Sequence, residues 1–164
     1  MLPVSSALEY ERNGDEKRHR VDDVSAADSS KVGTVRRVQL DPNPQSVAAA
    51  RDECDDLLHD LHVAQDMIST ACVIVSELVS NAVLHARTAS ELALEAHGRT
   101  LRVEVTDASI DDLHTCGSAS TSLGGRGLQI VDAFSDGHWG VVHDGGFKCV
   151  WAELDLGSDA LSYS

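Results

Sequence analysis

The sequence is poor in aromatic residues, which make up only 4% of its 164 positions. A hydrophobic core must therefore be built from valine, leucine, alanine and isoleucine side chains. The four cysteines are scattered, without a CxxC pair or a zinc-finger spacing. Cys72 and Cys149 lie inside apolar patterns, which is typical of small core residues in a reducing compartment.

Positive charge is also scarce. The 13 lysines and arginines face 27 acidic residues, so the formal net charge is −14. Sequence-independent nucleic-acid binding needs a cationic surface, and we therefore expect no direct nucleic-acid contact. The same charge argues against adhesion to an anionic membrane. The N-terminus has neither a signal-peptide pattern nor a lipidation motif, so a cytoplasmic protein is expected.

The longest apolar segment, residues 66–87, carries polar groups at a regular spacing. Its apolar pattern continues over about twenty residues without glycine or proline and predicts a helix, although residues 71–75 could alternatively form a buried strand. The segment is expected to be too polar to span a membrane. Glu77, Asn81 and His85 are spaced i, i+4, i+8 and form a polar line along that helix. Either they face solvent, or Glu77 faces a partner or a ligand, because burying an unpaired carboxylate is costly.

The remaining pattern predicts a single α+β domain over residues 32–156, with helices on one face of a mainly antiparallel sheet. Residues 1–31 are polar and are expected to form a disordered or partner-binding tail, and residues 157–164 form a C-terminal tail. The polar segment 109–123 is expected to be a lid. The predicted strands are 32–40, 91–96, 101–105, 138–142 and 148–156, and the further helices are 46–61 and 128–134.

Two further features resemble parts of a ligand site. Asp107 follows a predicted strand, where its carboxylate can lie at the rim of the sheet. The glycine-rich turn at positions 124–127 precedes a predicted helix, and such turns bind anions because backbone N–H groups point at the ligand. A phosphate-binding site that uses Asn81 and Glu77 would also need a divalent cation, and Mg²⁺ prefers oxygen ligands.

These segments resemble the motifs of the Bergerat-type ATPase superfamily, which includes gyrase, the heat-shock chaperone, sensor histidine kinases and mismatch-repair ATPases. Residues 77–86 resemble its N-box, Val103–Asp107 and the two residues after it resemble the first glycine box, and residues 125–131 resemble the second. The short length and the sequences around Trp139 and Trp151 are most similar to bacterial anti-sigma factor serine/threonine kinases of partner-switching systems.

The resemblance implies a two-layer Bergerat fold that binds ATP and Mg²⁺ between the central helix and the lid. Asn81 would hold Mg²⁺ against the phosphates, Asp107 would bind the adenine amino group, and Glu77 would act as the general base. The nucleotide-binding motif at the glycine-rich turn would comprise Gly125, Arg126, Gly127 and Leu128.

Two residues depart from the family pattern. Ser109 stands where the first box usually has glycine, and Cys149 is the nearest match to a threonine that relatives place near the adenine. Both departures bear on the expected nucleotide affinity more than on the fold.

The resemblance implies a kinase that sequesters a sigma factor and phosphorylates an anti-anti-sigma (STAS-type) partner, and relatives of this type are often homodimers. An alternative is a nucleotide-regulated binding module that transfers no phosphate. A sensor histidine kinase fragment is a third hypothesis, but residues 1–31 offer only His19 as a phosphoacceptor, without an apolar helical seam.

Overall fold

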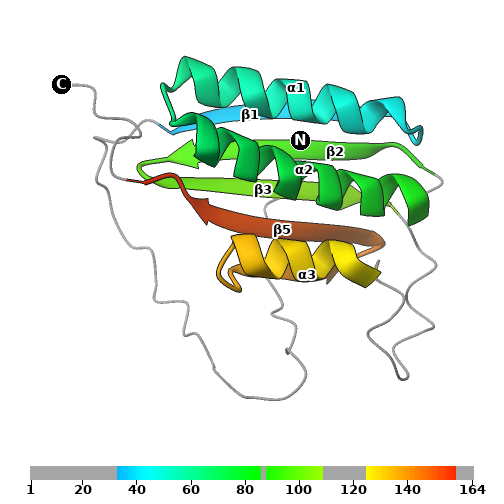
Figure 1. Ribbon diagram of the computed structural model, residues 1–164. Coiled ribbons are helices and arrows are strands. Elements are labelled where there is room, and N and C mark those ends of the chain that lie inside the picture. The colour runs from blue at the N-terminus through cyan, green and yellow to red at the C-terminus, as the bar shows by residue number, and fades with distance from the viewer. Residues whose placement is uncertain (1–32, 86–87, 109–124, 158–164) are drawn as a thin grey trace, which may run out of the picture.

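The computed structural model of the protein describes residues 33–85, 88–108 and 125–157 (Figure 1). Its elements are β1 (Thr34–Leu40), α1 (Gln45–Asp60), α2 (Gln65–His85), β2 (Ser90–His97), β3 (Thr100–Asp107), α3 (Gly125–Phe134), β4 (Trp139–Asp144) and β5 (Phe147–Asp155). Every predicted strand and helix within this part of the chain is present, and the bounds differ by a few residues. The alternative of a strand at residues 71–75 is wrong, because these residues lie inside α2.

The five strands form one sheet in the order β1-β2-β3-β5-β4, and each neighbouring pair is antiparallel. The three helices all cover one face of this sheet, as Figure 1 shows. This arrangement confirms the predicted α+β class with helices on one side of an antiparallel sheet. The opposite face of the sheet carries no helix from the described part of the chain (Figure 1).

The last hairpin depends on two glycines. Strands β4 and β5 are joined by Gly145 and Gly146, whose φ angles are 54° and 98°. A two-residue hairpin loop with positive φ at both positions matches the right-handed twist of the flanking strands, and glycine adopts this conformation without steric cost. The hairpin brings β5 beside β3 and leaves β4 at the edge of the sheet.

The hydrophobic core lies between α1, α2 and the helix-facing side of the sheet, and it is aliphatic as the composition predicts. α2 contributes one broad apolar face, including Ile68, Ile74, Val75, Leu78 and Val79, which are all at most 1% exposed. The helical conformation of α2 is therefore stabilised mainly by the packing of this face and less by intrinsic helix propensity, since valine and isoleucine are modest helix formers.

α2 also corrects one expectation. Its segment Gln65–Val83 is long and apolar enough to cross a membrane, with a mean hydropathy of 1.3, so it is not too polar to span one. Length and hydropathy alone do not distinguish a membrane span from the buried core helix of a globular domain, which meets the same limits. Here α2 packs on α1, α3 and the sheet.

Three predictions fall outside the described residues. These are the N-terminal tail, the lid at 109–123 and the C-terminal tail, apart from Gly157, which is described. They remain predictions.

Candidate functional site

The chain segments that carry the predicted site residues meet at one end of the fold. The C-terminal ends of α2 and β3 and the N-terminal end of α3 all lie at the right-hand side of Figure 1. The antiparallel register places the start of β5 there as well, since Asp107 pairs with Lys148. Residues far apart in the sequence, such as Glu77 and Gly127, therefore lie at the same end.

Gly127 lies close to the side chains of both Glu77 and Asn81. A Cβ atom on Gly127 would lie 2.5 Å from Glu77 Oε2 and 3.8 Å from Asn81 Oδ1. No side chain larger than hydrogen fits at Gly127 while the Glu77 carboxylate keeps its position. α2 and α3 therefore approach each other closely at this glycine.

The amide of Asn81 has an unusual environment. The residue is buried, with 9% of its surface exposed, and its Nδ2 has no hydrogen-bond partner in the part of the chain that the structure describes. Leaving a buried donor unpaired costs about 1–3 kcal/mol. The group therefore fits a bound acceptor such as a phosphate oxygen, whose binding would remove this cost.

The donor set also fits a magnesium ion that is held mostly by phosphates and water. Among the described residues, no group of three or more His, Cys, Asp or Glu side chains could hold a metal ion. Mg²⁺ bound with a nucleotide commonly keeps several waters and takes only one or two protein ligands. The oxygen of the Asn81 side chain is suited to this role, whereas a closed all-protein metal cage is absent from these segments.

Asp107 belongs to a row of buried polar side chains across the sheet. Ser90, Asp107 and Lys148 are directly opposite one another on β2, β3 and β5, and are 4%, 3% and 4% exposed. Their strand positions alternate in step with Val105 and Val150, so all three face the helices. The cross-strand position of Lys148 places a positive charge opposite the Asp107 carboxylate, as a buried charge requires.

Ser90 and Lys148 were not identified from the sequence. The signal for Lys148 was present, because it occupies an inward position in a strand whose other inward residues are Val150, Ala152 and Leu154. A lysine in such a pattern is either at a strand end facing solvent or paired in the interior. Only the register with β3 shows that it lies opposite Asp107.

Cys149 lies on the other side of the sheet from Asp107. It pairs with Thr106 and Val142, on the face that the helices do not cover, and therefore it does not take the place of an adenine-contacting threonine. Burial raises the pKa of its thiol, and a hydrogen bond with Thr106 opposes this shift. Lys148, rather than Cys149, is the β5 residue that shares a face with Asp107. Ser109, the other departure, lies outside the described residues.

The remaining motif residues divide into packing and exposed positions. Leu128, which was predicted to belong to the nucleotide-binding motif, is half-buried and packs on the hydrophobic core. Its side chain therefore anchors α3. Arg126 is exposed at the first turn of α3, where its side chain is accessible to a charged ligand. Gly125 begins the helix.

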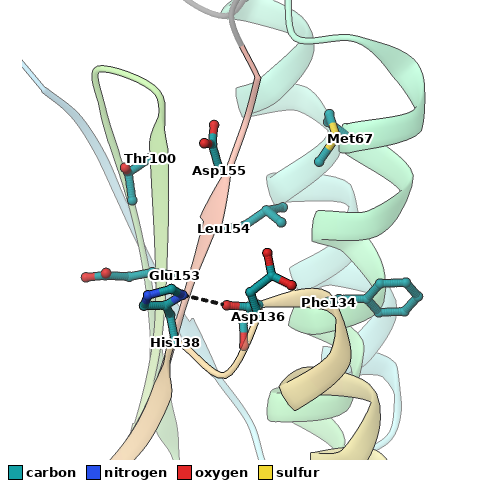
Figure 2. Close-up of a pocket in the computed structure, with 9 residues that line it drawn as sticks. Met67, Thr100, Phe134, Asp136, His138, Glu153, Leu154 and Asp155 are labelled. Carbon is teal, nitrogen blue, oxygen red and sulfur yellow. Dashed lines mark hydrogen bonds between the residues drawn. The ribbon is translucent and has the colours of Figure 1, made fainter.

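A hollow of about 400 Å³ lies at the opposite end of the sheet. It is lined by Met67, Thr100, Phe134, Ser135, Asp136, His138, Glu153, Leu154 and Asp155 (Figure 2). In this hollow His138 Nδ1 is hydrogen-bonded to the Ser135 carbonyl at 3.0 Å. None of the predicted site residues lines it, so this hollow is separate from the cluster around Asn81.

Comparisons with known proteins agree with this fold. The model of the histidine kinase-like ATPase domain family matches residues 40–153. A similar solved structure is that of the RsbU and RsbW domains of Rv1364c from Mycobacterium tuberculosis, with a TM-score of 0.60 and 18% sequence identity. The match covers 80% of this chain and 35% of that one, so this chain spans about a third of its length. A search of curated proteins finds no significant match.

The family match contains the α2, β3 and α3 motifs around Asn81, and the solved structure shares the fold. The match spans well over half of the chain, and the strand order and one-sided helical layer agree with it. The chain belongs to the histidine kinase-like ATPase domain family.

Proposed function

We propose that the protein binds Mg·ATP at the Asn81 end of the fold and transfers the γ-phosphoryl group to a serine or threonine hydroxyl of a protein partner. The observation that carries this proposal is the buried Asn81 amide, whose Nδ2 has no hydrogen-bond partner among the described residues and whose side chain lies, like that of Glu77, against Gly127. A buried donor beside a glycine-lined helix start suits a phosphate group, and an adjacent carboxylate suits proton transfer.

Each residue has a distinct role in this proposal. Asn81 would hold Mg²⁺ against the phosphates, the backbone at Gly125 and Gly127 would lie against the phosphates, and Asp107 would accept a hydrogen bond from the adenine amino group. Glu77 accepts the proton of the attacking hydroxyl as the oxygen bonds to the γ-phosphorus and ADP leaves. Bound Mg²⁺ would neutralise charge on the phosphates.

The proposed partners follow from the likeness to a structure that contains an RsbW domain. The protein would sequester a sigma factor and would phosphorylate a STAS-type anti-anti-sigma protein, as the sequence resemblance implies. The acidic surface, with a net charge of −14, favours protein partners with basic faces over nucleic acid. Dimerisation is part of the same proposal.

Calorimetric titration of ATP, with and without Mg²⁺, tests the site in the wild type and in Asn81→Ala. We expect Mg²⁺-dependent binding to the wild type and a loss of about tenfold or more in affinity in the variant, because a hydrogen bond to a charged group is removed. Ser76→Ala is the matched control on the same helix. The Ser76 hydroxyl donates a hydrogen bond to the Cys72 carbonyl of the helix backbone, at 2.7 Å. Equal ATP affinity in Asn81→Ala and the wild type would overturn the site.

Phosphoryl transfer is tested separately with γ-labelled ATP and a purified STAS-type protein. Glu77→Gln is expected to keep ATP binding and to abolish transfer, because the amide cannot accept the hydroxyl proton. Nucleotide binding without transfer in the wild type would instead favour the nucleotide-regulated binding module. Unchanged transfer in Glu77→Gln would show that Glu77 is not the base.

A further inference from the structure

Two cysteines meet where α1 packs on α2. Cys54 on α1 is fully buried, with 0% of its surface exposed, whereas Cys72 on α2 is half-buried. Both are free thiols, and each one shifts the pKa of the other. Cys72 lies against α1 close to Cys54, because its thiol contacts the carbonyl of Arg51, three residues before Cys54. The pair is formed by tertiary packing, because the two residues stand on different helices and have no motif spacing.

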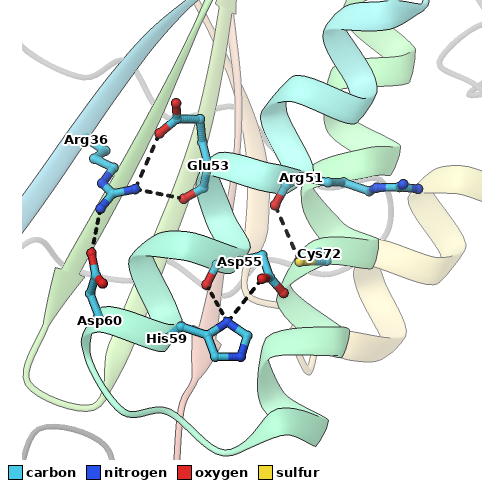
Figure 3. A network of polar contacts seen from close by, with 7 residues as sticks. All are labelled: Arg36, Arg51, Glu53, Asp55, His59, Asp60 and Cys72. Atoms are coloured by element: carbon cyan, nitrogen blue, oxygen red, sulfur yellow. Dashed lines mark hydrogen bonds and ion pairs between the residues drawn. The ribbon is translucent and has the colours of Figure 1, made fainter.

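The surroundings make the two sulfurs unequal. The hydrogen bond from Cys54 lowers the pKa of the Cys72 thiol, with a further contribution from Arg51, although burial and Asp55 oppose the shift. The same hydrogen bond, together with burial, raises the pKa of Cys54 far above its usual range. The Cys72 thiol also donates a hydrogen bond to the Arg51 carbonyl oxygen at 3.8 Å, which favours the protonated thiol (Figure 3). Cys72 is the more exposed sulfur and has the lower pKa, so it is the one that a peroxide reaches as a thiolate, and Cys54 remains protonated beside it.

We propose that Cys54 and Cys72 are a peroxide-reactive pair that forms a reversible disulfide between α1 and α2. The half-buried Cys72 thiolate attacks one oxygen of hydrogen peroxide, the O–O bond breaks, and the leaving hydroxide takes a proton to become water. Cys54 then attacks the sulfur of the Cys72 sulfenic acid, the S–O bond breaks, and a second water leaves with the Cys54 proton. In sum, two thiols are oxidised and one peroxide is reduced to two waters.

The pair is placed to act on the candidate site. A disulfide needs an S–S bond of about 2.05 Å, which is shorter than a contact between two thiols, so α1 and α2 must adjust locally to form it. Glu77 follows Cys72 on α2 by five residues, which corresponds to about 7.5 Å along the helix axis. Oxidation therefore changes the support of the helix that carries Glu77 and Asn81. Formation of the bond itself does not depend on nucleotide binding.

The test uses the purified full chain, treated with hydrogen peroxide, alkylated under denaturing conditions and digested with trypsin. Cys54 and Cys72 lie in one tryptic peptide, 52–87, while Cys116 and Cys149 lie in the separate peptides 103–126 and 149–164. We expect peptide 52–87 to lose two hydrogen atoms and both alkylation sites, and to regain them after treatment with dithiothreitol. Alkylation of both residues after peroxide, or a disulfide that links two different peptides, would overturn the proposal.

Two single variants, each of which replaces one small side chain, test which sulfur reacts first. In Cys54→Ala, we expect Cys72 to stop at sulfenic acid, which a dimedone probe labels about tenfold faster than it labels Cys149, because the thiolate is the reactive form. Cys149→Ser is the matched control and should form the peptide 52–87 disulfide as the wild type does. Equal labelling of Cys72 and Cys149 would contradict the assignment of Cys72 as the attacking sulfur.

Discussion

Asn81 is the residue at which stability and ligand binding oppose each other. Its buried Nδ2 has no hydrogen-bond partner among the described residues, so this donor adds nothing to the hydrogen bonding within that part of the fold. Replacing it with alanine removes an unsatisfied donor as well as some packing, so the folded state should tolerate the change. This separation of effects makes Asn81→Ala a clean probe of the proposed nucleotide site.

Gly127→Ala provides a prediction about geometry at the residue scale. The new methyl group would lie 2.5 Å from Glu77 Oε2, so the carboxylate must move away. This movement costs little free energy, because the carboxylate is the end of a flexible side chain. We expect the free energy of unfolding to change by less than about 1 kcal/mol, because better helix propensity offsets the clash. Phosphoryl transfer should fall about tenfold or more, since the displaced carboxylate is the proposed base.

A double-mutant cycle with Glu77→Ala checks this contact independently of activity. Urea unfolding of the wild type, both single variants and the double variant should give a coupling energy of about 0.5–3 kcal/mol, with Gly127→Ala more favourable when Glu77 is absent. Strictly additive effects would show that the two residues are not in contact in solution.

At the scale of elements, α1 is fixed to the edge strand by charged side chains. Arg36 on β1 donates to Asp60 at 2.9 Å and to Glu53 at 3.4 Å (Figure 3). Its side chain is 31% exposed, so each of these ion pairs contributes less than about 1 kcal/mol. Most of the attachment of α1 comes from Ala50, Cys54, Leu57 and Leu58, which are at most 1% exposed.

His59, in the last turn of α1, should make the stability of the fold weakly dependent on pH. A hydrogen bond with the Asp55 backbone carbonyl raises the pKa of His59 above 6.5, and the Asp55 carboxylate adds to this effect (Figure 3). The contribution of protonated His59 is therefore fully present below pH 6.5 and is lost as the pH rises through the folded-state pKa. We expect the Tm difference between wild type and His59→Ala to be larger at about pH 5.5 than at about pH 8.5. A difference that is equal at both pH values would contradict this expectation.

The predicted elements were accurate where periodicity and turn chemistry agreed. The strand at 101–105 was extended by the structure to Asp107, because pairing with β2 and β5 continues to the end of the sheet. α3 begins at Gly125 rather than at Leu128, since a helix can start within a glycine-rich turn when its backbone donors point outward. Both differences lie at element ends, which depend on neighbours distant in the sequence.

For the whole molecule, the net charge of −14 predicts that the fold is destabilised by self-repulsion at low ionic strength. We expect the Tm to rise by a few degrees between about 20 mM and 300 mM NaCl as the Debye length shortens. A Tm that is independent of salt over this range would contradict the expectation.

Asp56→Lys is a matched variant for the same prediction. Asp52 and Asp56 are exposed and stand i, i+4 on α1, where like charges repel, and the change reduces the net charge by two, from −14 to −12. We expect a Tm increase of about 2 °C at low salt that shrinks at high salt. An increase that does not depend on salt would point to helix propensity instead.

The sequence by itself determined the fold class, the order of the elements and the family. These follow from the local periodicity of apolar residues and from motifs such as the one around Glu77 and Asn81, whose spacing holds within a single helix. The tertiary structure alone decided which residues meet. Three features each depend on the register of strands or the packing of helices: the Asn81 Nδ2 without a hydrogen-bond partner among the described residues, the position of Lys148 opposite Asp107, and the packing of Cys72 against α1 near Cys54. The physical reason is that strand register and helix packing are determined by contacts between residues far apart in the chain, which periodicity within one segment does not encode.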